Sequence, residues 1–283
     1  MYEDLISKIK FAANTFTNAE KKIAEYILSN PQKVLYMSIS ELADTCDVGD
    51  TSVFRFCRHL DKKGYMDFKM DLAQTLTSRG ELGVSSGVDR EDDSLEAAAQ
   101  RAINDATAAM HETLNMNGTA NIKEVAKLMH KANRIFFFGM GSSMASAYEG
   151  YCRFMRVSPK AACLFDSHMQ TMYASLMQPG DVAIAFSYTG ATKDTIDIAE
   201  EARRADASVV AITHFSSSAL TDISDHVLLC GANEDPSQSG SFTGKLSQLF
   251  ILDLLYTEFY QLSLPESKEN LTRAMKSISE KLM

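Results

Sequence analysis

The chain has 283 residues, of which 45% are hydrophobic and 23% charged, which is enough for one large domain or two ordinary domains with separate cores. No stretch approaches the run of about 18 apolar residues that a membrane-spanning helix needs, and the N-terminus lacks the basic start and apolar core of an export signal. The five cysteines are scattered and never form a Cys-x-x-Cys pair, which argues against a disulfide framework or a zinc site. These features predict a soluble cytoplasmic protein without a metal, a cofactor or a membrane partner.

The net charge of −9 is distributed unevenly along the chain. Residues 1–80 contain eleven basic and eleven acidic side chains, so the acidic excess belongs entirely to the remainder. This neutral first part holds a local basic cluster, formed by Arg55, Arg58, Lys62 and Lys63. The uneven charge predicts two parts with different partners, and the basic cluster leaves DNA binding open.

Residues 1–77 are predicted to form short helices separated by tight turns. Capping boxes at Thr17–Glu20 and Ser38–Glu41 each begin a helix. The first of these helices ends at Asn30, because the residue before a proline is pushed away from helical angles. Apolar periodicity predicts two more helices, over 50–60 and 67–76.

A short helix, a glycine-containing turn and a second helix over about 37–60 have the spacing of a helix-turn-helix. The second helix would pack inward through Val53, Phe56 and Leu60. Base edges would be met by its outward N-terminal residues, which are Thr51, Ser52 and Arg55. Phosphate contacts are expected further along, from Arg58, Lys62 and Lys63. The alternative is a helical bundle that uses a solvated charged face for protein contact.

Three stretches of this first part resemble the N-terminal domain of RpiR/MurR-type transcriptional regulators. They are Met37–Ala43, Val48–Leu60 and Lys63–Lys69. The resemblance implies a DNA-binding domain over 1–77. One departure is Asp50, because an aspartate facing DNA is repelled unless it caps the helix or accepts from a cytosine amino group.

Residues 78–94 are rich in glycine, serine and acidic side chains and are predicted to be a linker. A helical connection is predicted over 95–122, because small and apolar residues recur at helical spacing from Leu95 to Leu114. This face would pack in the chain's own core, or against another helix or a second subunit.

From residue 134 onward, apolar runs alternate with helical patterns. The predicted strands are 134–138, 161–165, 182–186, 208–213 and 226–230, and the helices between them are about 143–156, 168–177, 193–205 and 216–221. Such alternation predicts an α/β fold with a doubly wound parallel sheet. A long helix over 243–262 and a polar C-terminal helix over 266–283 complete the chain.

Two loops that follow predicted strands and begin helices are rich in hydroxyl side chains. The first offers Ser142 and Ser143, and the second offers Ser187, Thr189 and Thr192 around Gly190. Unpaired N–H groups and the positive end of the helix dipole favour an anion at a helix start. Because ligands bind at the carboxyl ends of parallel strands, we predict a site for one phosphomonoester. The alternative is that Thr192 merely caps a helix.

Two enzymatic alternatives remain open. Gly139-x-Gly141 is part of a dinucleotide fingerprint, with Asp166 near the place of a ribose-binding acid, although Met144 stands where the third glycine belongs. This pattern would suit an NAD-dependent oxidoreductase. A sugar-phosphate isomerase would need a base and an acid, and the available groups are Glu149, His168, His214 and Glu234.

Residues 123–265 resemble the sugar isomerase (SIS) fold, a flavodoxin-like sheet that forms the second domain of RpiR-type regulators. The resemblance implies that both hydroxyl loops hold a sugar phosphate, with Tyr188 at a position that is often polar. It also implies that His168, in an Asp-x-His element, touches a sugar hydroxyl and that Lys245 faces the ligand.

Taken together, the two resemblances imply a transcriptional regulator of a sugar or amino-sugar catabolic operon and not an enzyme, with repression or activation both open. Its effector, by family analogy, would be N-acetylmannosamine 6-phosphate or a related amino-sugar phosphate such as N-acetylmuramate 6-phosphate. A homodimer or higher oligomer would bind a palindromic operator in double-stranded DNA.

Overall fold

The computed structural model describes residues 4–79, 94–231 and 242–279, so most of the predicted linker lies outside the described residues. The chain divides into two compact units, and the division falls between Asp105 and Ala106 within one long helix. We call residues 4–79 the head and residues 106–279 the sheet unit, and each is described by itself.

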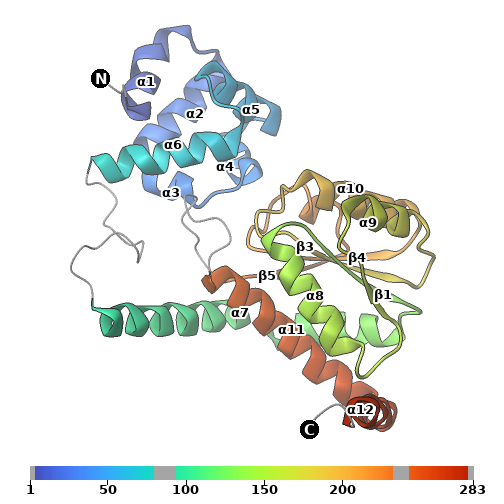
Figure 1. The fold of residues 1–283 in the computed structure, drawn as a ribbon. Helices are drawn as coiled ribbons and strands as arrows, with labels where there is room; N and C mark the ends of the chain where they lie inside the picture. Colours follow the sequence, from blue (N-terminus) through green and yellow to red (C-terminus); the bar gives the residue numbers. More distant parts are fainter. Residues whose placement is uncertain (1–3, 80–93, 232–241, 280–283) are drawn as a thin grey trace. The chain divides into compact units, whose positions relative to one another are not determined.

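The head is built from short helices (Figure 1). They are α1 (Leu5–Ala12), the 3-10 turn η1 (Ala13–Thr15), α2 (Asn18–Ser29), α3 (Pro31–Leu35), α4 (Ile39–Thr45), α5 (Asp50–His59) and α6 (Tyr65–Ser78). Both predicted capping boxes are present, at the starts of α2 and α4. Helix α3 was not predicted: Pro31, which ends α2, occupies the first position of α3, where a missing N–H costs nothing.

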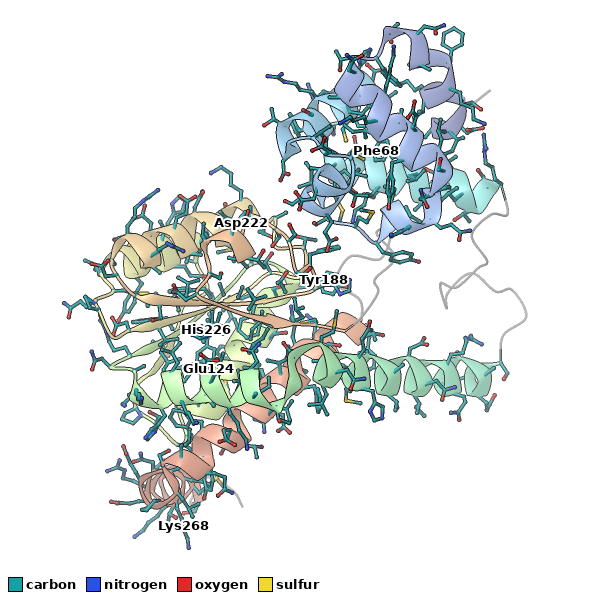
Figure 2. All side chains as sticks on the ribbon, turned by 180° about the vertical axis from the view of Figure 1, so that it is seen from behind. Phe68, Glu124, Tyr188, Asp222, His226 and Lys268 are labelled. Atoms are coloured by element: carbon teal, nitrogen blue, oxygen red, sulfur yellow. The ribbon has the colours of Figure 1, made fainter. Side chains whose placement is uncertain are left out.

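One apolar cluster draws on every α-helix of the head. Val53, Phe56 and Leu60 are fully buried in it, which confirms the predicted inward face of α5. The ring of Phe56 contacts those of Phe16 and Phe68 at centroid distances of 5.2 and 5.9 Å, and Phe68 lies among the helices in Figure 2. Aromatic contacts of this kind add to the stability gained from burial alone.

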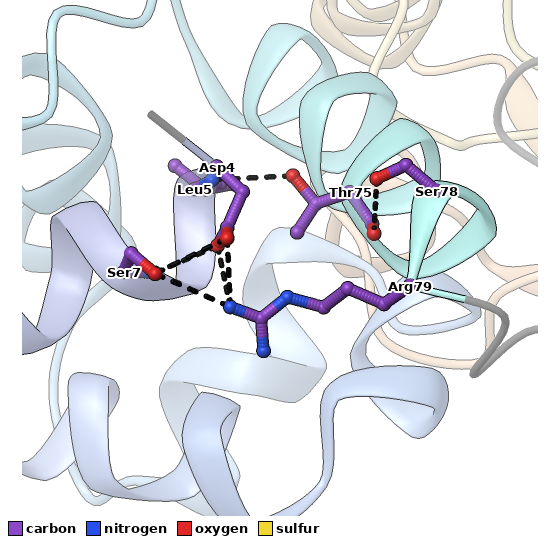
Figure 3. A network of polar contacts seen from close by, with 6 residues as sticks. All are labelled: Asp4, Leu5, Ser7, Thr75, Ser78 and Arg79. Carbon is purple, nitrogen blue, oxygen red and sulfur yellow. Dashed lines mark hydrogen bonds and ion pairs between the residues drawn. The ribbon is translucent and has the colours of Figure 1, made fainter. Parts of the chain in front are cut away.

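A polar network joins the first and last helices of the head (Figure 3). Asp4 caps α1 by accepting from the Ser7 N–H at 2.8 Å, and Arg79 donates to both carboxylate oxygens of Asp4 at 2.7 and 2.8 Å. These hydrogen bonds hold the pKa of the Asp4 carboxyl below its ordinary value. The Leu5 N–H donates to the Thr75 hydroxyl at 3.2 Å. The network closes the head where α1 begins and α6 ends.

Lys69 is a buried cation in the head. Its Nζ donates to the carbonyls of Leu35 and Met37 at 3.2 and 3.0 Å and lies 5.4 Å from the centroid of the Tyr65 ring. These bonds fix the segment between α3 and α4. Burial disfavours the charged ammonium and lowers the pKa of Lys69 to about 8.

We expect Lys69 by itself to raise the free energy of unfolding by about 2 kcal/mol between pH 8 and pH 10. Buried Cys57, whose pKa burial raises to about 12, opposes this rise above pH 9, because there the folded state keeps a thiol proton that the unfolded chain releases. The folded head releases the Lys69 proton near pH 8, whereas the unfolded chain holds it up to the ordinary pKa of 10.5, so the unfolded state binds more protons in this interval. Above about pH 10 the effect is opposed by buried Tyr65, whose pKa is raised by desolvation. Urea unfolding at pH 7, 8, 9 and 10 would measure how the free energy of unfolding changes with pH. Between pH 8 and pH 10, the change in the free energy of unfolding should be about 2 kcal/mol smaller in Lys69→Met than in the wild type, and equal changes in both proteins would contradict this account.

The sheet unit contains five parallel strands in the order β2-β1-β3-β4-β5. The strands are β1 (Ile135–Gly139), β2 (Ala161–Cys163), β3 (Val182–Phe186), β4 (Ser208–Thr213) and β5 (His226–Leu229). The helices are α7 (Leu95–Lys131), which belongs to this unit from Ala106 onward, α8 (Ser142–Phe154), α9 (Ser167–Ser175), α10 (Lys193–Arg204), α11 (Phe242–Leu262) and α12 (Leu264–Ser279), together with the 3-10 turn η2 (Thr221–Ile223). The predicted doubly wound, flavodoxin-like sheet is confirmed.

The central strands are buried on both faces, and their side chains alternate between two cores. Ile135 and Phe137 of β1 join an apolar cluster with residues of α7, α8 and α11, while Phe136 and Phe138 join another with residues of α9 and α10. A three-layer arrangement results, and it explains why the sequence of these strands is continuously apolar. No helix in the described part of the chain is long and apolar enough to cross a membrane.

One helix prediction is wrong, and another is confirmed with one change. The segment 216–221 is not a helix but a series of bends that leads into η2. Here Ser218 and Thr221 exchange side-chain and backbone hydrogen bonds, which compete with helical bonding. The helical connection predicted over 95–122 is confirmed as part of α7, and Gly118, with φ 62°, adds a kink within it. Within α7, Ala106, Ala109 and Thr113 are buried, so packing against the sheet unit begins at Ala106.

Candidate functional sites

Helices α4 and α5 with the turn between them form the predicted helix-turn-helix. The turn includes Asp47, whose φ is 50°, and α5 begins directly after Gly49. Thr51 and Arg55 are exposed at the start of α5, and Ser52 is partly exposed beside them. The three predicted base-contacting residues therefore lie on the outward face of α5, the second helix of the helix-turn-helix.

Asp50 neither caps α5 nor stands unpaired. The cap position belongs to Gly49, and the Asp50 carboxylate accepts a hydrogen bond of 2.7 Å from the hydroxyl of Ser40 in α4. This bond ties the two helices of the motif together. The structure thus gives Asp50 a role within the protein that the sequence did not suggest.

The predicted phosphate-contacting residues differ in their surroundings. Arg58 and Lys63 are exposed. Lys62 forms an ion pair with Asp71 at 2.5 Å, and only 20% of its side chain is accessible. A phosphate would have to compete with Asp71 for Lys62, so Arg58 and Lys63 are the stronger candidates.

In the sheet unit, the two hydroxyl loops follow neighbouring strands. The first follows β1 and the second follows β3, and these strands pair in register from Ile135–Val182 to Gly139–Phe186. The strand order reverses direction between β1 and β3, which is where doubly wound sheets bind ligands. The fold therefore brings the Ser142–Ser143 loop and the Ser187–Thr192 loop to one edge of the sheet.

The loop after β3 leaves the start of α10 without a side-chain cap. Thr192 occupies the cap position but makes no capping hydrogen bond; its Oγ1 accepts instead from the hydroxyl of Ser187 at 3.1 Å. The alternative that Thr192 merely caps a helix is therefore wrong. Because no side chain from the cap position covers the first-turn N–H groups, they can donate to an anion.

Several contacts hold this loop in shape. Gly190 has φ 62°, and a Cβ at this position would lie 2.1 Å from the Ser218 hydroxyl, so the loop requires glycine here. The Gly190 N–H donates to the Ser187 carbonyl at 3.1 Å. The Thr189 hydroxyl accepts from the Ala191 N–H at 3.3 Å. The loop is thus preorganised around the helix start.

Tyr188 points its ring at an aromatic cluster. The ring stacks on His214 with a centroid distance of 5.0 Å and an interplanar angle of 4°, and Phe215 packs edge-on against both rings. The Tyr188 carbonyl accepts from the Thr213 hydroxyl at 3.1 Å. The Tyr188 ring, labelled in Figure 2, is therefore held against the residues that follow β4.

The loop after β1 carries the predicted serines at the start of α8. Ser142 is exposed, Ser143 is largely buried, and Gly141 before them has φ 54°. Lys245, in the first turn of α11, donates to the Ser142 carbonyl at 2.6 Å. The structure thus places Lys245 at this loop although 103 residues separate the two in the chain.

His168 is exposed in the first turn of α9. Asp166, the first residue of the Asp-x-His sequence, caps α9 by accepting from the Met169 N–H at 2.9 Å. Among the groups considered for the enzymatic alternatives, Glu149 is exposed on α8 and Glu234 lies outside the described residues. The Asp166 carboxylate, which the oxidoreductase alternative assigned to a ribose, is engaged as the cap of α9.

Gln170 is a residue that the sequence did not single out. It is fully buried, and its amide bonds both backbone groups of Gly139: Oε1 accepts from the N–H at 3.2 Å and Nε2 donates to the carbonyl at 3.3 Å. Strand β2 pairs with β1 only as far as Phe137. At Gly139, the last residue of β1, the Gln170 amide therefore takes the place of a β2 backbone partner. It holds the end of the strand from which the Ser142–Ser143 loop begins.

Gln170→Leu is expected to lower the free energy of unfolding by roughly 2–4 kcal/mol, because it leaves a buried N–H and a buried carbonyl without partners. Chemical denaturation of the full chain would measure the change. Gln178→Leu, at an exposed position close by, should have little effect. An equal decrease in the free energy of unfolding in both variants would show that the hydrogen bonds from Gln170 to Gly139 are not the cause of the loss.

Comparison with known proteins agrees with this architecture. Residues 3–79 match the helix-turn-helix domain of the rpiR family, and residues 128–258 match the SIS domain. The chain is 31% identical over 280 residues to the HTH-type transcriptional regulator HexR of Escherichia coli K12, covering 98% of this chain and 95% of that protein. It is 33% identical over 255 residues to HexR of Pseudomonas aeruginosa, covering 90% and 88%.

Solved structures give the same result. The Vibrio vulnificus NanR protein complexed with ManNAc-6P superimposes with a TM-score of 0.87 and 26% sequence identity, over 99% of both chains. The sugar isomerase domain of an RpiR transcription factor from Sphaerobacter thermophilus covers 64% of this chain with a TM-score of 0.56 and 21% identity. The chain therefore belongs to the rpiR family of helix-turn-helix transcriptional regulators, with a SIS domain after the helix-turn-helix domain.

Proposed function

We propose that the SIS domain binds a phosphorylated sugar and that this ligand controls the binding of the head to operator DNA. The observation that carries the proposal is the start of α10, which has no side-chain cap and follows a loop that carries the hydroxyls of Ser187, Thr189 and Thr192. An anion with several acceptor oxygens fits donors arranged in this way. A ligand that binds two arrangements of the protein with different affinities shifts the balance between them.

The sugar end of the ligand would lie towards the first loop and α9. There, Ser142, Ser143 and His168 offer polar groups, and Lys245 adds a cation that already reaches the Ser142 carbonyl. The solved relative that binds ManNAc-6P supports an amino-sugar phosphate as the effector. We propose N-acetylmannosamine 6-phosphate as the first compound to test, and repression of a sugar catabolic operon in the cytoplasm as the role.

A thermal-shift screen of sugar phosphates tests this proposal. A true ligand at 100 times its dissociation constant should add about 2.7 kcal/mol of stability, and it should change the affinity for operator DNA. Turnover of hexose or pentose phosphates would instead support an isomerase. Stabilisation by NAD, with no response to any sugar phosphate, would support an oxidoreductase.

We further propose that the chain acts as a homodimer that contacts its second copy through the β2 edge of the sheet unit. A helix-turn-helix reads one half-site, so a palindromic operator needs a twofold pair. Phe165, which follows β2, and Met172, in the next helix α9, are 65% and 58% exposed, and the Phe165 ring lies 4.8 Å from the exposed ring of Tyr148 between centroids. Residues 161–180 contain one formal charge, on Asp166, so two copies can meet there with little like-charge repulsion.

Phe165→Glu is expected to shift the protein from dimer to monomer, because it places a charge in an apolar contact. Sedimentation velocity would measure the mass. Met275→Glu, at an exposed position on α12, serves as the matched control. An unchanged dimer in Phe165→Glu would place the interface elsewhere.

A further inference from the structure

Phe54 is the single apolar side chain on the outward face of α5. The inward positions of this helix, Val53, Phe56 and Cys57, are buried in the core of the head. Phe54 is 45% exposed, and helical spacing places it beside Thr51 and Arg58. Its ring is therefore presented on the same surface as the predicted DNA-contacting residues, where it contributes little to the core.

The ring of Phe54 is held in position. A Cβ at Gly64 would lie 3.6 Å from Phe54 Cε2, so the ring packs over the backbone of the turn between α5 and α6. Lys63, a candidate phosphate contact, is the chain neighbour of Gly64. A side chain that is already supported loses less conformational entropy when it binds, so Phe54 is suited to make a specific contact.

The chemistry of the major groove limits what an exposed phenyl ring can read there. Bases present donors and acceptors at that edge, and the apolar group among them is the C5-methyl of thymine. Thr51, Ser52 and Arg55 can address donors and acceptors, but none of them is a large apolar surface. Phe54 supplies that surface.

This inference rests on the proposed DNA-binding role of the head: we propose that Phe54 packs against the C5-methyl of one thymine in each half-site and so specifies a T·A pair there. Arg55 would select by hydrogen bonds, whereas Phe54 would select by shape and burial. If Phe54 instead contacts sugar, phosphate or another protein, binding will not depend on the methyl group.

Replacing thymine by deoxyuridine tests the contact, because it removes the methyl group and leaves the base pairing unchanged. The full-length chain would first select duplexes from a randomised pool. Each thymine of the selected duplex would then be replaced in turn, and affinity measured by fluorescence anisotropy at one salt concentration. At the contacted thymine, the affinity should fall roughly three- to fivefold, as expected for one buried methyl group.

A double-mutant cycle assigns this loss to Phe54. In Phe54→Ala, the same deoxyuridine substitution should have no further effect. Phe11→Ala removes an 85% exposed phenylalanine from α1 and should keep the full sensitivity. Equal sensitivity of the wild type and Phe54→Ala at every thymine would overturn the inference while leaving DNA binding established. Failure to select any sequence would overturn the proposed operator binding itself, and the thymine contact with it.

Discussion

Arg55→Ala is expected to lower the affinity for the selected operator roughly 10- to 100-fold, the range for loss of one good bidentate contact to a base. Arg55 is exposed on α5, beside Thr51 and one turn before Arg58, and its guanidinium can donate twice to a guanine edge. Anisotropy titrations with the selected duplex and with scrambled duplexes would measure the loss. Sugar-phosphate binding by the SIS domain should be unchanged.

Lys63→Ala is the matched control for Arg55→Ala. Lys63 is an exposed cation at the turn after α5, and a phosphate contact carries no sequence information. Loss of the Lys63 ammonium should lower the affinity for all duplexes equally and reduce the slope of log affinity against log salt by about one. If Arg55→Ala also weakens operator and scrambled duplexes equally, Arg55 contacts the backbone and the base contacts belong to other residues.

Ser187→Ala combined with Thr192→Ala is expected to abolish the response to the sugar phosphate while operator binding persists. The two hydroxyls bond each other at 3.1 Å at the uncapped start of α10. Each hydrogen bond to a charged group is worth about 1.5–3 kcal/mol. Losing one such bond from each hydroxyl should therefore lower the affinity for the sugar phosphate at least roughly 100-fold. Thermal shifts with increasing ligand, followed by operator titrations in the presence of ligand, would measure both effects.

The variant that controls for damage to the loop is Ser217→Ala together with Ser216→Ala, which removes two hydroxyls from the segment after β4 and leaves Ser187 and Thr192 unchanged. This pair should retain the thermal shift. A normal ligand response in the Ser187/Thr192 double variant would show that the phosphate binds elsewhere.

The local features of the fold could be predicted from the sequence because they depend on near neighbours. The capping boxes at Thr17 and Ser38 join residues three apart, and the continuous apolar runs of β1 and β3 reflect burial on both faces. Alternation of strands and helices then leaves few possible topologies. The same local patterns identified both hydroxyl loops and the exposed face of α5.

Contacts between distant residues were decided by the tertiary structure. Gln170 bonds Gly139 across 31 residues, Lys245 bonds Ser142 across 103, and Lys69 bonds Leu35 across 34. The sequence shows that such side chains can donate or accept, but packing determines which partner each one meets. For the same reason, the sequence left open a helix-capping role for Thr192, and the structure shows its hydroxyl bonded to that of Ser187 instead.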